Sequence, residues 1–260
     1  MGTELDVNDR LRGILDRARE GKAPGRDDCA YLLGLPEAGL EAGLLRATAD
    51  AVMRQRFGNE AIILGQIGVE IAPCPAACKF CSFGEGHTGF APKIMSRAEI
   101  LACADAFTAS GELFALFLMT MHTFAFDRLL ETVRTVRERI PAGTQIVVNI
   151  GDFDATQAAE LHAAGVNGAY HVCRLRECID TELDPEDRKE TIRVIRNSGL
   201  DWYYCCEPVG PEHTVEELVE QMFLGIEYGC FQHAAMRRVY VPGAPLDRKS
   251  TRLNSSHRIR

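Results

Sequence analysis

The chain has 260 residues, of which 46% are hydrophobic and 25% charged, and its formal net charge is −8. This length and composition are typical of a globular protein and allow a single α/β barrel domain. The acidic balance argues against nucleic acid as a partner, and no segment is long enough to span a membrane. The N-terminus lacks an apolar leader, and ten cysteines without a leader are typical of the reducing cytoplasm. We therefore expect a cytoplasmic protein whose cysteines bind metal or act in catalysis rather than form disulfides.

Residues 1–62 are predicted to form an N-terminal helical extension. Apolar side chains recur there at helical spacing, namely at Leu5, Leu11, Ile14, Leu15 and Ala18. Asp27 and Asp28 are expected to cap a short helix that ends at Leu33. Residues 36–56, which are rich in Ala and Leu, are expected to form a longer helix.

Strand-like and helix-like segments alternate over residues 63–246. The predicted strands cover residues 65–72, 113–119, 145–150, 168–172, 202–206 and about 235–241. The predicted helices cover residues 96–109, 126–139, 154–164, 185–197 and 215–228, and the first of these opens on a capping box, Ser96-x-x-Glu99. Such alternation predicts parallel strands with right-handed crossovers. We predict an α/β fold, a partial TIM-type (β/α)6 barrel, with its chemistry at the carboxyl ends of the strands.

Cys74, Cys78 and Cys81 follow the first predicted strand with the spacing C-x3-C-x2-C. Three closely spaced thiolates suit a [4Fe–4S] cluster that keeps one iron without a protein ligand. A structural zinc site instead needs four ligands, and His87 is the one nearby candidate for the fourth. A third interpretation is incidental buried thiols, which fits the isolated Cys29, Cys103 and Cys230 better than it fits the triplet. The spacing favours the cluster.

Residues 247–260 break the alternating pattern. They are polar and basic and resemble translated cloning or adaptor sequence, so we exclude them from the predicted core. The alternative interpretation is a basic arm for an acidic partner.

The cysteine spacing, the aromatic Phe80 before the last cysteine and the six β/α units resemble the radical S-adenosylmethionine (SAM) superfamily. The similarity covers about residues 40–246 and is greatest to the biotin-synthase-like branch, on the local matches Arg54-Gln-Arg-Phe-Gly, Ala72-Pro-Cys-Pro-x-x-Cys-Lys-Phe-Cys and Val241-Pro-Gly-Ala-Pro-Leu. The resemblance implies a [4Fe–4S] cluster that cleaves SAM reductively to a 5′-deoxyadenosyl radical. That radical would abstract hydrogen from a small metabolite in cofactor or amino-acid biosynthesis. It also implies a reductant such as flavodoxin or ferredoxin.

The resemblance further implies a set of cofactor-binding residues, four of which have an ordinary structural alternative. Phe80 would pack near adenine, and Thr120 stands where the family has a Gly-Gly-Glu-like motif for the amino group. Asn149, beside Gly151, matches a polar segment that lines the cavity. The remaining matches are His171, Arg174 near the ribose, Arg188 on the cofactor carboxylate, and Glu207 and Gly210 in a segment that packs against adenine. The alternatives are loop packing for Phe80, a core position for His171, and exposed or capping positions for Arg188 and Glu207.

One departure from biotin synthase concerns its second cluster. The positions that carry cysteine there align here with Leu118, Val147 and Tyr204, which cannot bind iron as thiolates do. Sulfur insertion is therefore not expected, and Cys173, Cys178, Cys205 and Cys206 are interpreted as buried thiols rather than an auxiliary site. Chains of this branch continue beyond the sixth strand, so we expect part of the substrate pocket to be missing. An iron–sulfur electron-transfer or cluster-carrier protein without SAM cleavage, and a zinc-stabilised binding module, are the competing functions.

Overall fold

The computed structural model describes residues 7–247. Contacts within it divide the chain into two compact units, one of residues 7–62 with Thr214–Phe223 and one of Ile63–His213 with residues 224–247. Of the predicted adaptor-like tail, residues 248–260 lie outside the described residues.

The first unit contains three helices, α1 (Asp9–Arg19), α2 (Arg26–Leu33) and α3 (Leu40–Phe57). The side chain of Asn8 caps α1 by accepting a hydrogen bond from the Arg10 amide, and Leu11 and Ile14 form the buried face of that helix. The predicted caps of α2 are wrong, because Gly25 is the N-cap and Asp27 and Asp28 lie in the first turn. There they complement the helix dipole instead.

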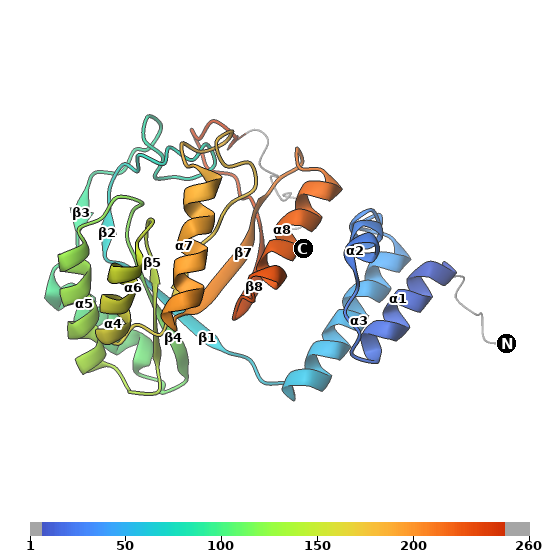
Figure 1. The fold of residues 1–260 in the computed structure, drawn as a ribbon, viewed down its shortest axis with the longest axis horizontal. Helices are drawn as coiled ribbons and strands as arrows, with labels where there is room; N and C mark the ends of the chain where they lie inside the picture. Colours follow the sequence, from blue (N-terminus) through green and yellow to red (C-terminus); the bar gives the residue numbers. More distant parts are fainter. Residues whose placement is uncertain (1–6, 248–260) are drawn as a thin grey trace, which may run out of the picture. The chain divides into compact units, whose positions relative to one another are not determined.

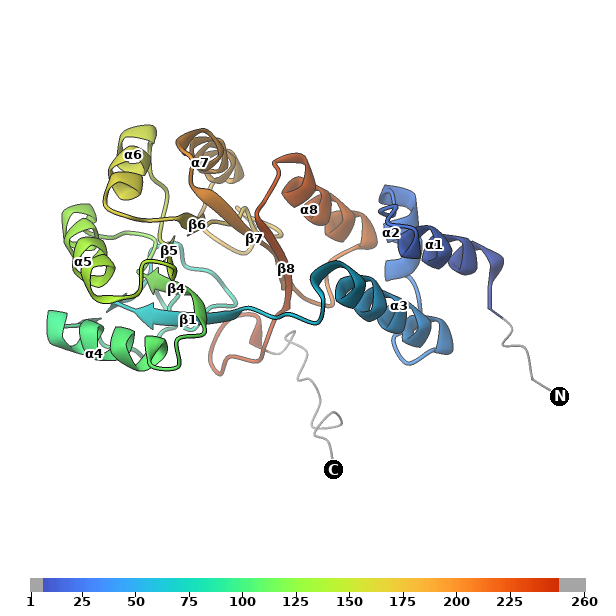
Figure 2. The same cartoon turned by 90° about the horizontal axis from the view of Figure 1, so that it is seen from below.

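The second unit is built on a six-stranded parallel sheet in the order β1-β4-β5-β6-β7-β8. The strands are β1 (Ile63–Gly68), β4 (Leu113–Met119), β5 (Gln145–Asn149), β6 (Gly168–Tyr170), β7 (Asp201–Val209) and β8 (Gln232–Arg237). The crossover helices are α4 (Arg97–Thr108), α5 (Phe126–Arg139), α6 (Ala155–Ala163), α7 (Pro185–Ser198) and α8 (Val215–Glu227). The sheet curls, and α4 to α7 cover its outer side (Figures 1 and 2). This half-barrel confirms the predicted partial TIM-type fold.

Two strand predictions need correction. The expected strand over residues 65–72 is divided at Val69, where the chain leaves the sheet. Its second part, β2 (Glu70–Ile71), pairs antiparallel with β3 (Lys93–Ile94), a strand that was not predicted. The last strand lies at Gln232–Arg237 rather than near 235–241, so the Val241-Pro-Gly-Ala-Pro-Leu segment follows it. The apolar Val239, which follows the strand, is 64% exposed.

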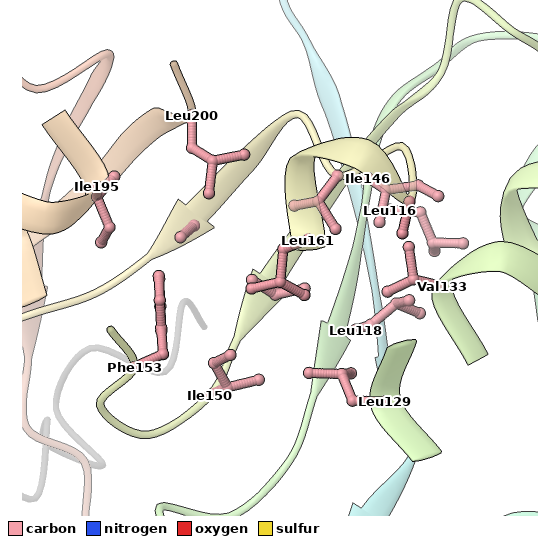
Figure 3. Packing of buried hydrophobic residues seen from close by; sticks show 14 of the residues in the cluster. Leu116, Leu118, Leu129, Val133, Ile146, Ile150, Phe153, Leu161, Ile195 and Leu200 are labelled. Carbon is pink, nitrogen blue, oxygen red and sulfur yellow. The ribbon is translucent and has the colours of Figure 1, made fainter. Parts of the chain in front are cut away.

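The main core lies between the sheet and its helices. Alternate residues of the strands, such as Leu116 and Leu118 of β4 and Ile146 of β5, face Val133 of α5 and Leu161 of α6 (Figure 3). All five are completely buried because period-two strands and amphipathic helices present their apolar faces to each other.

A smaller cluster fills the inner side of the curled sheet. It contains Ala115, Phe117, Val147 and Tyr203, with Tyr170 packed against it. The rings of Phe117 and Tyr203 meet edge to face with centroids 5.4 Å apart, and the Tyr203 hydroxyl donates to Gln145 Oε1 at 2.8 Å. None of the helices in the described part of the chain has the length and apolar character needed to cross a membrane.

Candidate active site

The three motif cysteines lie on a loop between β2 and β3 that folds back on itself. The Cys74 amide donates to the Phe83 carbonyl at 2.7 Å, and the Cys74 carbonyl accepts from the Glu85 amide at 3.0 Å. Inside this closed loop, the Cys81 amide donates to the Cys78 carbonyl at 3.0 Å. The backbone therefore brings the three thiols to one side of a compact turn.

His87 braces the loop. Its Nε2 lies 2.7 Å from the Cys81 carbonyl oxygen, to which it donates. The ring covers Gly84 so closely that a Cβ there would lie 2.2 Å from the imidazole, so only glycine fits. His87 is thus engaged with the backbone of the loop, and this geometry does not support its alternative interpretation as a zinc ligand.

The segment between β6 and α7 clamps the cysteine loop from a distant part of the sequence. The Lys79 amide donates to the Asp180 carbonyl, and the Glu182 amide donates to the Ala76 carbonyl, each at 2.9 Å. Leu183 packs against Ala76 and Cys78 in a small buried cluster. The loop geometry therefore depends on residues about a hundred positions later in the chain.

All three thiols line a cavity of about 380 Å³ at the carboxyl ends of the parallel strands. Four predicted cofactor residues line it as well, namely Thr120, Asn149, Arg174 and Arg188. Apolar side chains form much of the remaining wall, among them Ile71, Phe83, Met119, Met121, Val172 and Leu183. Mostly apolar walls with a few directed polar groups are typical of small-molecule sites.

Four other predicted residues do not line this cavity. Phe80 packs beside the cysteines in the cluster that contains Ala76 and Leu183. Glu207 and His171 are buried behind the wall. Gly210 lies in a different group, where its amide donates to His213 Nδ1 at 2.8 Å and a Cβ would contact Arg238 at 2.6 Å.

Arg174 is held by a buried carboxylate and hydroxyl. Its Nε lies 3.1 Å from Glu207 Oε1, and the Tyr170 hydroxyl donates to Glu207 Oε2 at 2.7 Å. Burial opposes the charge of Arg174, but Glu207, Cys78 and Glu177 together raise its pKa above the ordinary value. Arg174 therefore stays cationic beside the thiols.

Arg188 is held by Asp152, a residue that the sequence did not indicate. Arg188 Nη1 lies 2.9 Å from Asp152 Oδ1, and its Nε donates to the Val172 carbonyl at 3.1 Å. The Thr191 hydroxyl donates to the same Asp152 oxygen at 2.8 Å. Burial by itself would raise the pKa of Asp152, but His171, the charge of Arg188 and Thr191 keep it well below the ordinary range. Asp152 is therefore ionised and pairs with Arg188.

Sequence reasoning also missed His122, Tyr170 and Glu177. Glu177 is buried and accepts hydrogen bonds from the Arg174 amide and the Thr181 hydroxyl. His122 and Tyr170 line the cavity. One signal was available, because His122 and Tyr170 follow or end strands whose carboxyl ends were expected to carry the chemistry.

Of the loop thiols, Cys78 is buried and Cys81 is half-buried. Burial raises the pKa of Cys78 to about 12, and the nearby charge of Arg174 only partly opposes this. Burial also raises the pKa of Cys81. Binding to a metal centre, which requires thiolates, must therefore displace protons from these sites.

The donor set fits an iron–sulfur cluster better than a single ion. Among residues 7–247 no group of three or more His, Cys, Asp or Glu side chains could hold a metal ion. Tetrahedral zinc, with Zn–S bonds of about 2.3 Å, would need thiolates only about 3.8 Å apart. A cluster takes one thiolate at each of three irons, which suits three cysteines that line one cavity.

The positions aligned with the second cluster of biotin synthase do not share one face of the sheet. Val147 faces the inner side, whereas Leu118 and Tyr204 belong to the outer core. The inward neighbour of Leu118 is Phe117, and those of Tyr204 are Tyr203 and, by strand alternation, Cys205. Phe117, Val147 and Tyr203 offer no thiolate, and Cys205 alone cannot replace three thiolates.

Comparison with known proteins was made by sequence and by fold. No family model matches the chain. A biotin synthase of Geobacter metallireducens is 27% identical over 194 residues, which cover 70% of this chain and 58% of that protein. The chain therefore spans little more than half the length of that curated relative.

The fold matches two solved structures closely. Methylornithine synthase (PylB) has a TM-score of 0.82 at 17% identity, covering 94% of this chain and 73% of that one. HydG, a maturase of the [FeFe]-hydrogenase, has a TM-score of 0.74 at 13% identity, covering 90% and 55%. By sequence this chain is similar to biotin synthases, and its fold is that of PylB and HydG.

Proposed function

We propose that this protein is a radical SAM enzyme in which Cys74, Cys78 and Cys81 hold a [4Fe–4S] cluster and the adjoining cavity holds SAM and a small-molecule substrate. One observation carries the proposal. The three thiols of the C-x3-C-x2-C loop line the same cavity as the polar side chains at the carboxyl ends of the sheet. The chemistry that the bound cluster and SAM supply is one-electron cleavage of the sulfonium for hydrogen-atom abstraction from the substrate.

The residues of the chain bind, orient and exclude water. Arg174 and Arg188 each have a fixed carboxylate partner, so their guanidinium groups are oriented before any ligand enters. Such preorganised donors suit a carboxylate or hydroxyl group of a ligand. Met119, Met121 and Leu183 supply apolar wall that keeps water from the reacting atoms.

The proposal extends to partners and pathway. A small metabolite in cofactor or amino-acid biosynthesis is the proposed substrate, and a flavodoxin or ferredoxin the proposed reductant. All ten cysteines are free thiols, which supports a reducing cytoplasmic location. Phe117, Val147 and Tyr203 fill the inner side of the sheet. Sulfur insertion of the biotin synthase kind is therefore not part of the proposal.

An electron-transfer or cluster-carrier protein is the competing function. Such a protein needs an accessible cluster but no ligand cavity beside it. The cavity of about 380 Å³ and its two paired arginines favour the enzyme instead.

Anaerobic reconstitution with iron and sulfide tests the proposal. The loaded protein should contain four irons per chain, bind SAM, and release 5′-deoxyadenosine when dithionite is added. A stable cluster that cycles between redox states without binding SAM or releasing 5′-deoxyadenosine would favour the carrier. Zinc in place of iron and sulfide would contradict both functions.

A further inference from the structure

The two carboxylate oxygens of Asp152 have different surroundings. Oδ1 is 2.9 Å from Arg188 Nη1, 2.8 Å from Thr191 Oγ1 and 3.3 Å from His171 Nε2. Oδ2 lies 3.9 Å from His122 Nε2. One oxygen therefore anchors the side chain, and the other is presented to His122.

The backbone fixes His122 opposite Asp152. A Cβ at Gly151 would lie 1.8 Å from the His122 carbonyl oxygen, so the loop after β4 rests directly on the loop after β5. The Thr120 amide donates to the Asn149 carbonyl at 3.0 Å two residues earlier in each loop. His122 lines the cavity, as does Arg188 on the other side of Asp152.

The gap between the two side chains has the size of one bridging oxygen. At 3.9 Å, Nε2 and Oδ2 are too far apart to hydrogen-bond directly. An oxygen placed about 2.8 Å from both atoms would subtend an angle of about 90° between them, which is narrower than the tetrahedral angle of about 109° but allows a hydroxyl to accept one bond and donate another. We propose that His122, which lines the cavity, and Asp152, whose partly exposed side chain lies beside it, form a hydroxyl-binding pair at the edge of the cavity, in which a ligand hydroxyl donates to Asp152 Oδ2 and accepts from His122 Nε2–H.

The local charges favour a neutral hydroxyl over a charged group. Asp152 is already neutralised by Arg188 at 2.9 Å. Burial lowers the pKa of His122, so the imidazole is neutral near pH 7. A carboxylate or phosphate would meet the Asp152 oxygen, and an ammonium group would meet the guanidinium of Arg188.

His171 contacts Asp152 from behind the cavity wall. Its side chain is completely buried, and its Nε2 lies 3.3 Å from Asp152 Oδ1. Neither ring nitrogen has a hydrogen-bond partner among the described residues, although buried polar groups are normally satisfied. The polar group around Asp152 is therefore incompletely hydrogen-bonded, and its side towards His122 is the one that a ligand can reach.

The hydroxyl has two sources within the proposed function, on which this inference rests: the ribose of SAM or the substrate. The first arm measures binding of SAM and of its 2′-deoxy and 3′-deoxy ribose analogues to reconstituted protein by calorimetry. Asp152→Asn and His122→Phe are compared with the wild type, and Asp105→Asn, which removes the charge of an exposed arginine-paired carboxylate, is the matched control. The second arm measures binding of D-ribose and glycerol to the SAM-loaded protein by saturation-transfer NMR.

If the hydroxyl belongs to SAM, both variants weaken SAM binding about tenfold or more, and neither weakens the analogue that lacks that hydroxyl. If it belongs to the substrate, SAM binding is unchanged, and the polyol signals seen with the wild type disappear in both variants. The control variant Asp105→Asn should change neither SAM binding nor the polyol signals. The inference is overturned if both variants bind SAM and polyols as the wild type does. It is also overturned if the wild type binds no polyol and both variants bind SAM with unaltered affinity. Iron content and 5′-deoxyadenosine release are assayed separately, so failure of the proposed function is recognised independently.

Discussion

The outer core of the sheet and the cavity wall are stabilised in different ways. The core is a continuous apolar cluster in which Leu116, Ile146 and Leu161 are completely buried and need only shape and burial from their neighbours. In the wall, buried charges each require one partner, as Arg174 requires Glu207 and Arg188 requires Asp152. The difference implies that substitutions in the core should lower stability without changing what the cavity binds. Substitutions at the cysteine loop should change what the cavity binds with little change in stability.

The largest expected effect is at the cysteines. Cys74→Ala, Cys78→Ala and Cys81→Ala should each abolish stable cluster loading, because two thiolates cannot replace three on the cluster. Iron and sulfide analysis after anaerobic reconstitution measures this, and urea denaturation of the unloaded protein should show little change in the free energy of unfolding. Cys103→Ala, at a half-buried cysteine of α4, is the control and should load normally. Normal loading in all three loop variants would contradict the cluster assignment.

The opposite test truncates the core. Leu161 is completely buried between α6 and the sheet. Leu161→Ala should lower the free energy of unfolding by about 2–5 kcal/mol, through lost burial and the cavity that remains. Cluster content at low temperature should stay normal. Ile226→Ala, at a position 62% exposed, should cost far less in the same urea titration. A Leu161→Ala protein of normal stability that fails to load iron would remove the distinction between the two regions.

The sequence predicted the core far better than the cavity wall. The core depends on local apolar patterns, whereas the wall depends on single pairs of residues that are far apart in the sequence. β4 and α5 were expected at residues 113–119 and 126–139 and occur there, because a continuous apolar run and helical periodicity are local signals. The capping box of Ser96 and Glu99 also forms as expected. The pairing of β2 with β3 was missed because each strand has two residues and carries no periodic pattern.

The cavity wall was predicted only where the family resemblance indicated it. The resemblance implied Thr120, Asn149 and Arg174 as cofactor-binding residues, and all three line the cavity. Asp152 was missed because its importance comes from Arg188 and Thr191, which lie 36 and 39 residues later. No local pattern encodes a pairing over such a separation.

A smaller effect is expected where the two regions meet. Gly151→Ala would place a Cβ 1.8 Å from the His122 carbonyl oxygen, so one of the two loops must move. Overpacking of this kind costs about 1–3 kcal/mol and occasionally more. Unlike Leu161→Ala, it should also weaken SAM binding, because both loops border the cavity. Gly143→Ala, where a Cβ would meet nothing within 4 Å, is the matched control and should be neutral or slightly stabilising. Equal behaviour of the two glycine variants would contradict the interlocked loops.

The smallest effect is a pH dependence that arises from His171. Burial, followed by the charge of Arg188, lowers the pKa of His171 to about 3 in the folded protein, whereas an unfolded histidine titrates near 6.5. Between these two values the unfolded chain binds the extra proton, so the free energy of unfolding should fall as the pH falls from about 6.5 towards 3. The slope from one such group is at most about 1.4 kcal/mol per pH unit.

Asp152, whose pKa is also lowered, adds a loss in the same direction only below about pH 4, where the unfolded carboxyl begins to take up a proton. In urea titrations at pH 7.5, 6 and 5, His171 contributes together with His122, whose pKa burial also lowers, and His171→Gln should reduce the dependence in that interval. His162→Gln is the control, since that residue lies in the last turn of α6 outside the wall, and it should leave the slope unchanged. Equal slopes in the wild type and His171→Gln would mean that His171 accepts a proton in the folded state, and the wall around Asp152 would then carry an additional positive charge.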